Sequence, residues 1–200
     1  MSKLATAVNF KELYAPGRTQ PSIVEVPKLK FLMVDGMGDP NTSADFQGAI
    51  QALFTLSWGI HFALKGAGVD SHVRPLEALW WSDRDLVQGN ASKWHWTAMM
   101  LQPDEITGEI LDEALAEARR KRSIPALDKV RLESFHEGLS AQVMHVGPYS
   151  AEKPTIERLR AFIAAAGYRP RGKHHEIYIG DPRRAAPEKL KTVIRLPIVR

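Results

Sequence analysis

One stretch near the C-terminal end, residues 173–182, constrains the fold most. It reads Lys-His-His-Glu-Ile-Tyr-Ile-Gly-Asp-Pro, and its alternation predicts a β-strand that ends at the Gly-Asp-Pro turn. Alternate side chains of a strand point to opposite faces. One face therefore holds His174, Glu176 and Tyr178, and the other holds His175, Ile177 and Ile179. The isoleucine face requires a core. The carboxylate between an imidazole and a phenol is either part of a solvated sheet surface or the floor of a polar-aromatic cleft.

The composition of the chain favours a single globular domain. The chain has 200 residues, of which 44% are hydrophobic, and this is enough to bury a sizeable core. It has no cysteine, which excludes disulfides, thiolate zinc sites and cysteine nucleophiles. Neither a membrane-spanning apolar run nor a signal peptide is present in the sequence. We therefore expect a soluble protein of the cytoplasm that does not contact membranes.

Hydrophobic periodicity predicts a mixture of helices and strands. Expected strands run over residues 29–36, 73–81, 93–101, 173–179 and 191–199, and expected helices over 45–65, 104–122 and 154–166. A short helical pattern around residues 10–14 lies in an N-terminal arm. Residues 129–135 and 139–146 are expected to form a hairpin around Glu137-Gly138. A polar link, residues 82–92, separates the second and third strands.

Three other features suggest chemistry that the residues support weakly. The glycine turn at residues 35–41 follows a strand, but it lacks the Lys-Ser/Thr of a phosphate loop and its aspartates would repel phosphate. The basic run at residues 119–122 is explained by the dipole of the helix that it ends, so we expect no direct nucleic-acid contact. His145, His174 and His175 form no two-histidine-plus-carboxylate pattern, because adjacent histidines of a strand face apart. We expect neither a metal nor another cofactor.

Tryptophans are concentrated in the second and third predicted strands, which hold four of the five in the chain. Trp80 and Trp81 are expected to point to opposite faces, whereas Trp94 and Trp96 share one face. At least three indoles would therefore line one side of a sheet if the strand registers agree. Such indoles are common in hydrophobic cores as well as in ligand cages.

The two halves of the chain repeat the same order of elements. Each has an apolar strand, a glycine turn, a helix and two further strands, which suggests a first repeat at residues 29–103 and a second at 129–200. Residues 1–28 then form an arm, and residues 104–128 an inserted helix. Aligning the repeats matches Glu77 with Glu176 and places Trp81 on the face of Glu77. The alignment predicts a pseudo-symmetric pair of strands that bear carboxylates.

Six segments together resemble the stand-alone GyrI-like small-molecule-binding proteins. They are VDGMGDPN at 34–41, PLEALWW at 75–81, WHW at 94–96, HVGPY at 145–149, HHEIY at 174–178 and PEKLKT at 187–192. The resemblance covers nearly the whole chain. It implies an α+β fold of duplicated, helix-backed antiparallel sheet modules with pseudo-twofold symmetry and a central ligand cleft. A haem-binding SOUL branch shares that fold.

The resemblance also implies a function and a set of site residues. The tryptophan-rich form without a DNA-binding domain is similar to the branch that hydrolyses cyclopropanoid alkylating toxins inside an aromatic cage. Glu176 matches the central glutamate of the family and, with Tyr149 or Tyr178, is expected to carry the catalysis. The expected ligand-binding residues are Trp81, Trp94, Trp96, Glu77 and His174. Planar aromatic molecules, including cations, are the expected ligands, since rings stack on indoles and a buried carboxylate attracts positive charge.

Two alternatives remain open at this stage. A protein that binds or sequesters drugs without turnover would need nearly the same residues. A modulator of a protein partner, such as a topoisomerase or a transcription factor, is also compatible with the family and with the net charge of +4.

Overall fold

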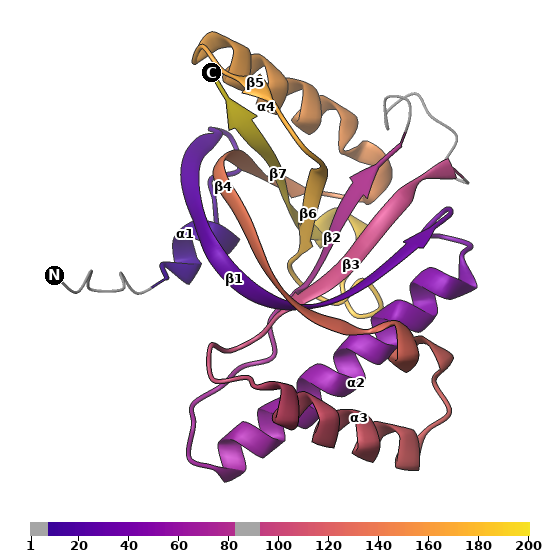
Figure 1. The fold of residues 1–200 in the computed structure, drawn as a ribbon. Coiled ribbons are helices and arrows are strands. Elements are labelled where there is room, and N and C mark those ends of the chain that lie inside the picture. The colour runs from indigo at the N-terminus through magenta and orange to yellow at the C-terminus, as the bar shows by residue number, and fades with distance from the viewer. Residues whose placement is uncertain (1–7, 83–92) are drawn as a thin grey trace, which may run out of the picture. The chain divides into compact units, whose positions relative to one another are not determined.

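The computed structural model describes residues 8–82 and 93–200, and this part of the chain is α+β, as predicted (Figure 1). It divides into two compact units. The central unit comprises Lys28–Phe135 and Lys173–Tyr178, and the terminal unit comprises Met1–Pro27, His136–Gly172 and Ile179–Arg200. Strands β1 (Ser22–Met37) and β4 (Arg131–Val146) are long enough to contribute residues to both units.

The central unit is built on an antiparallel sheet in the order β1-β3-β2-β6. Its further strands are β2 (Leu76–Trp81), β3 (His95–Leu101) and β6 (His174–Tyr178). Because a long stretch of chain separates β2 from β6, their pairing joins residues about one hundred positions apart. That pairing sets Ala78 opposite Glu176 and Trp80 opposite His174.

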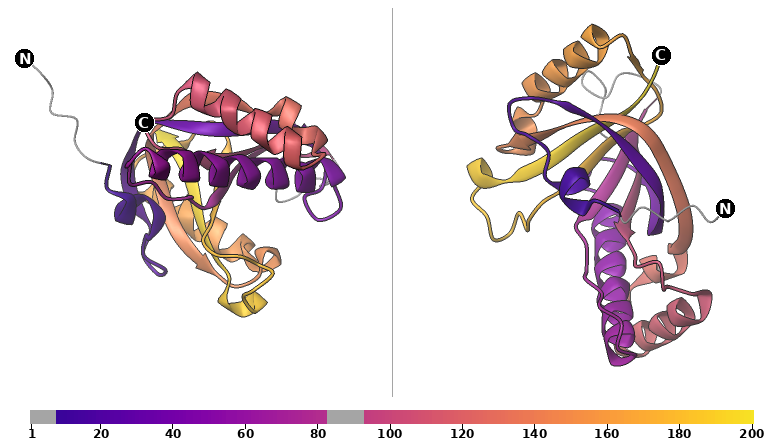
Figure 2. Two further views of the ribbon diagram at one scale, coloured as in Figure 1. Left: turned by 90° about the horizontal axis from the view of Figure 1, so that it is seen from below. Right: turned by 90° about the vertical axis from the view of Figure 1, so that its left-hand side faces the viewer.

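Two helices cover one face of this sheet. Helix α2 (Ala44–Gly66) begins at Ser43, whose hydroxyl accepts a hydrogen bond from the backbone N–H of Phe46 at 3.2 Å, and α3 (Gly108–Lys121) packs beside it (Figures 1 and 2). The 3-10 turn η2 (Pro125–Lys129) also packs on α2. The apolar face of α2 and the inner side chains of the strands form one core. Burial of this face stabilises α2 more than its intrinsic helix propensity does.

The terminal unit has its own sheet and helix. Strand β7 (Lys191–Val199) pairs antiparallel with β4 over Ser140–Val146 and with the short β5 (Arg169–Pro170). Helix α4 (Lys153–Ala165) packs Leu159 and Ile163 onto this sheet. The small helix α1 (Phe10–Tyr14) and the 3-10 turns η3 (Tyr149–Ala151) and η4 (Pro187–Lys189) complete the unit.

The helices lie where the sequence predicts them, but the predicted hairpin around Glu137-Gly138 is wrong. Residues 131–146 form one continuous strand, β4, and no reversal occurs at Gly138. Gly138 adopts a positive φ of 73°, a conformation that glycine allows within a strand as well as in a turn. Strand β1 also starts earlier than expected, at Ser22 within the predicted arm. The polar link falls mostly outside the described residues, and the division into two repeats stays a prediction.

No helix among residues 8–82 and 93–200 is long and apolar enough to cross a membrane. In the same ranges, no group of three or more histidine, aspartate or glutamate side chains is placed to hold a metal ion.

Candidate functional site

The polar face of β6 carries a chain of hydrogen bonds centred on Glu176. Tyr178 Oη donates to Glu176 Oε2 at 2.7 Å, and His174 Nε2 lies 3.0 Å from Glu176 Oε1. Trp80 Nε1 in turn donates to Tyr178 Oη at 3.2 Å, which completes the series from β2 to β6. His174 donates when Nε2 bears its proton. Both oxygens of the carboxylate are therefore held in fixed positions.

Glu176 does not lie on a solvated surface. Its side chain is only 16% exposed, and that of His174 only 10%. Its cross-strand neighbours, Ala78 and then Ala98, are small and fully buried. The carboxylate thus lies beside a row of short side chains, with aromatic residues in the adjoining rows. A carboxylate withdrawn from water in this way interacts with a nearby charge more strongly than one in bulk solvent.

An aromatic cluster adjoins this carboxylate on the same face. Phe46, from the first turn of α2, contacts Trp80 and Trp96 with ring centroids 5.3 Å and 5.0 Å apart. Trp94 meets Trp80 edge-on at 5.9 Å. Trp96 occupies its place because its cross-strand partner is Gly36, where any Cβ would collide with the indole ring. We refer to Phe46, Trp80, Trp94, Trp96 and Tyr178 as the aromatic cluster.

Two indole N–H groups of this cluster have no partner in the described part of the chain. Nε1 of Trp94 and Nε1 of Trp96 are buried and make no hydrogen bond there. A buried donor without an acceptor costs about 1–3 kcal/mol relative to a satisfied one. Such groups call for an explanation, and a ligand with acceptor atoms would supply one.

The structure brings together most, though not all, of the residues that the sequence predicted for the site. His174, Glu176, Tyr178, Trp94 and Trp96 belong to the same side of the central sheet. They were identified by strand alternation and by the resemblance, and the hydrogen bonds join three of them directly. Their role in binding or catalysis stays a prediction.

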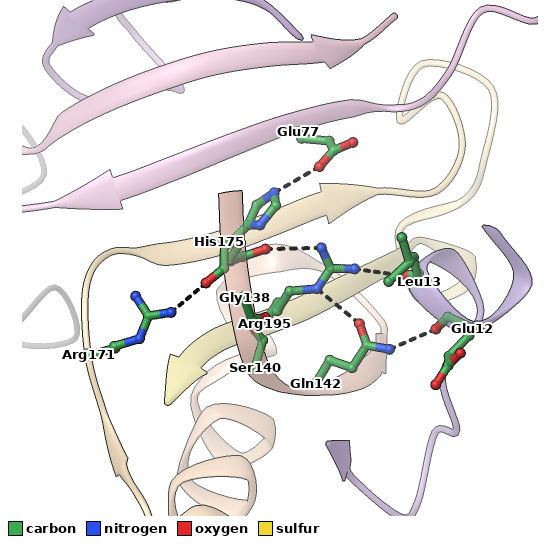
Figure 3. A network of polar contacts seen from close by, with 10 residues as sticks. Glu12, Leu13, Glu77, Gly138, Ser140, Gln142, Arg171, His175 and Arg195 are labelled. Atoms are coloured by element: carbon green, nitrogen blue, oxygen red, sulfur yellow. Dashed lines mark hydrogen bonds and ion pairs between the residues drawn. The ribbon is translucent and has the colours of Figure 1, made fainter. Parts of the chain in front are cut away.

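Glu77 and Trp81 lie on the opposite face of the sheet. The strand register pairs Glu77 with Ile177, so Glu77 points away from the face of Glu176. Glu77 Oε2 lies instead 2.9 Å from His175 Nε2, and both side chains are 1% exposed (Figure 3). The repeat alignment thus matched two glutamates that the register sends to opposite faces, and Glu77 and Trp81 lie across the sheet from Glu176.

Tyr149 belongs to the terminal unit, where it opens η3 and is 39% exposed. It follows Gly147, whose φ of 139° requires glycine, and Pro148. His145 Nε2 lies 3.2 Å from the carbonyl oxygen of Pro148 and supports this turn. The participation of Tyr149 in catalysis therefore stays a prediction.

Two members of the cluster were missed from the sequence. Trp80 and Phe46 were interpreted only as strand and helix core positions. The signal for Trp80 was available, because it alternates with Trp81 and falls on the opposite face. Phe46 had no local signal, since its contact with the indoles depends on how α2 packs on the sheet.

Comparison with family models identifies the family of the chain. The model of the GyrI-like small-molecule-binding domain matches residues 19–199. The chain belongs to the GyrI-like family. No curated protein matches the chain.

Several solved structures are similar to this GyrI-like chain over nearly its whole length. An uncharacterised conserved protein from Listeria innocua is 39% identical, with a TM-score of 0.88 and coverage of 94% of this chain and 96% of that one. Two further structures from Listeria innocua, each described as a hydrolase, are 38% and 39% identical with TM-scores of 0.82 and 0.86. They cover 95% and 94% of this chain, and 96% of each hydrolase chain is covered.

The C-terminal domain of EcmrR is a more distant match, and its similarity to this chain shows a common fold and nothing more. It is 13% identical with a TM-score of 0.58, and the match covers 90% of this chain and 98% of that domain.

Proposed function

We propose that this GyrI-like protein binds planar aromatic molecules against the aromatic cluster and hydrolyses those that carry a strained cyclopropane ring. The observation that carries the proposal is the Glu176 carboxylate, 16% exposed and held between Tyr178 and His174 beside four further aromatic rings. The similar hydrolases from Listeria innocua support a hydrolytic reaction over a binding role alone. The resemblance to cyclopropanoid hydrolases supplies the substrate class.

The aromatic cluster would hold the plane of the substrate. Indole and phenol rings bind flat molecules by stacking and by burial of apolar area, and this restricts the orientation of the reacting ring. The unpartnered N–H groups of Trp94 and Trp96 would donate to acceptor atoms of the ligand. A cationic ligand would gain additionally from the quadrupoles of the rings and from Glu176.

Glu176 would act on the attacking water. The water oxygen forms a bond to a cyclopropane carbon, while the electron pair of the cleaved carbon–carbon bond moves through the conjugated ring to the carbonyl oxygen. Glu176 takes the proton of the water, and the carbonyl becomes a phenolate that is then protonated to a phenol. Relief of ring strain and formation of the aromatic phenol both drive the reaction, so positioning and a base supply most of what the protein must add.

Tyr178 and Tyr149 are the candidates for stabilising the developing phenolate. Tyr178 Oη donates to Glu176 in the structure and would have to turn its proton toward the substrate oxygen. Tyr149 would serve if its hydroxyl reaches that oxygen in the complex. An O–H donor aimed at a developing oxyanion lowers the barrier because the charge forms where the dipole already points.

Product analysis tests the proposal. The protein is incubated with a cyclopropanoid alkylator, and mass spectrometry measures addition of one water to the ligand. We expect enzyme-dependent addition that Glu176→Gln slows roughly a hundredfold or more, while Glu188→Gln, an exposed glutamate of η4, retains full activity. Tyr178→Phe and Tyr149→Phe identify the tyrosine that assists. Intact ligand recovered after stoichiometric binding would instead establish sequestration.

A further inference from the structure

A pocket lies on the face of the central sheet opposite Glu176. It has a volume of about 560 Å³ and is lined by Asp35, Gly36, Met37, Trp81, His95, Thr97, Arg131 and Lys173. All of these residues belong to the central unit. Trp81, which the sequence assigned to the aromatic cage, lines this pocket because the strand register places it on this face.

One row of side chains forms the wall of this pocket. The register pairs Trp81 with His95 and His95 with Met37 across three neighbouring strands, and Lys173 continues the row at the start of β6. The Trp81 and His95 rings stack at 5.6 Å with an interplanar angle of 16°. Lys173 Nζ lies 3.3 Å from the centroid of the Trp81 ring. The wall is therefore flat and largely apolar, with an ammonium group at one end.

The charges around the pocket are unequally matched. Arg131 pairs with Asp35 at 2.9 Å and with Glu133 at 2.8 Å, and Thr97 Oγ1 donates to Asp35 Oδ1 at 2.6 Å. Arg131 thus has two carboxylate partners, and the three groups together keep one negative charge. Within the described residues, Lys173 has no carboxylate at ion-pair distance, and the Trp81 ring is its contact. Lys173 is thus the cation of the pocket that Asp35 and Glu133 attract only from beyond ion-pair distance.

The protonation of Lys173 agrees with this view. Burial lowers the pKa of Lys173 and outweighs the attraction of Asp35 and Glu133, which raises it, while Arg131 lowers it further. An ammonium group withdrawn from water with no carboxylate at ion-pair distance is unfavourable, and a ligand carboxylate beside it lowers that cost.

We propose that this pocket binds an aromatic carboxylate, with the carboxylate on Lys173 and the apolar body along Trp81, His95 and Met37. The site is independent of the Glu176 site, since the two lie on opposite faces of the same sheet. The volume of the pocket is in the range of small-molecule sites. Asp35 and Glu133 disfavour an anion placed near Arg131, so the carboxylate has to lie at the Lys173 end.

Naphthoate is a suitable probe, and naphthylmethylammonium is its control of similar shape and opposite charge. Calorimetric titration of the wild-type protein is expected to show saturable binding of naphthoate. The ammonium is a planar aromatic cation that the Glu176 site would also accept, so its binding here is judged by the indole N–H signal of Trp81, which it is expected to shift little. Lys173→Gln is expected to weaken naphthoate at least about tenfold, because one charge-assisted contact is lost. Lys173→Arg keeps the charge and is expected to restore most of the affinity. Lys189→Gln removes an exposed lysine of the terminal unit and is expected to leave the affinity unchanged.

A second measurement locates the ligand without relying on affinity. In a two-dimensional NMR spectrum the indole N–H signal of Trp81, assigned through Trp81→Phe, is expected to shift on adding naphthoate. The signals of the aromatic cluster are expected to shift less, and Glu176→Gln is expected to leave the binding unaltered. No saturable binding, equal binding by Lys173→Gln, or loss of binding in Glu176→Gln would each overturn the proposal. None of these results bears on hydrolysis at Glu176.

Discussion

Glu77 and His175 form a buried pair across β2 and β6. Their side chains meet at 2.9 Å between Oε2 and Nε2, and each is 1% exposed (Figure 3). A polar pair so deep in the sheet requires both partners, because either group left alone keeps its desolvation cost without compensation. The pair therefore fixes the register of β6 on β2, and with it the position of Glu176.

Replacing one member of this pair is expected to destabilise the protein strongly. Glu77→Ala should lower the free energy of unfolding by about 3–5 kcal/mol, because the buried His175 loses its carboxylate partner at 2.9 Å. Urea denaturation followed by circular dichroism measures the effect, and Glu188→Ala, at an exposed site, should change it by less than about 0.5 kcal/mol. Glu77→Leu combined with His175→Phe should recover much of the loss. A single substitution as mild as the control would contradict the structural role.

The sequence predicted the two faces of β6 correctly, because alternation within one strand is local information. It did not predict which face of β2 joins the face of Glu176, since register depends on hydrogen bonds between segments far apart in the chain. The internal repeat suggested that Glu77 and Glu176 are equivalent, but the observed pairing of Glu77 with Ile177 places them on opposite sides. The same limit explains why Trp80 was missed and Trp81 was assigned to the cage.

Buried polar contacts of the terminal unit were invisible in the sequence for the same reason. Arg195 is 2% exposed and donates to Glu137 Oε2 at 3.2 Å, to Gln142 Oε1 at 3.0 Å and to the carbonyl oxygen of Leu13 at 2.6 Å (Figure 3). Each contact joins a different part of the chain. The pair Glu137-Gly138 also led to the incorrect hairpin prediction. A Glu-Gly pair between two apolar runs is typical of a turn as well as of a bulge in a strand.

The Arg195 contacts predict that α1 is held by this side chain. Arg195→Met should lower the free energy of unfolding by about 3–5 kcal/mol, since the buried Glu137 then loses the guanidinium at 3.2 Å. Amide hydrogen exchange should also accelerate in α1, because the Leu13 carbonyl loses its donor. Arg184→Met removes a guanidinium that is 88% exposed and serves as the control. Unchanged exchange in α1 of the Arg195→Met protein would show that other contacts hold the helix.

Gly36 is expected to be irreplaceable for packing and not for backbone conformation. A Cβ at this position would overlap the Trp96 ring, so Gly36→Ala should displace the indole and cost about 1–3 kcal/mol. Gly66→Ala is the matched control, because a Cβ at the end of α2 meets nothing within 4 Å. Alanine there should be neutral or stabilise by up to about 1 kcal/mol. Thermal unfolding and near-ultraviolet circular dichroism, which reports on the indoles, distinguish the two variants.

A substitution at Gly138 tests whether β4 requires a positive φ at this position. Its φ of 73° is unfavourable for residues with a side chain, and a Cβ would lie 3.1 Å from a guanidinium nitrogen of Arg171. Gly138→Ala should therefore destabilise the protein by about 1–2 kcal/mol. Chemical denaturation measures the loss. A neutral result would mean that the strand relaxes to negative φ and that the positive φ is not required.

Lys173 predicts a pH dependence whose sign follows from its lowered pKa. In the folded protein burial makes the ammonium lose its proton at lower pH than in the unfolded chain. Between the folded pKa and the ordinary lysine value of about 10.4, the unfolded chain binds more protons, so this residue makes the folded state more stable as pH rises. Below the folded pKa its cost is fully present. The Lys173→Met protein has no titrating group at this position and no buried ammonium to destabilise it. The stability of the wild-type protein relative to Lys173→Met should therefore increase with pH. Urea unfolding from neutral pH up to about 10.4 measures this difference. A difference that falls or stays flat would mean that the ammonium is not destabilised by burial.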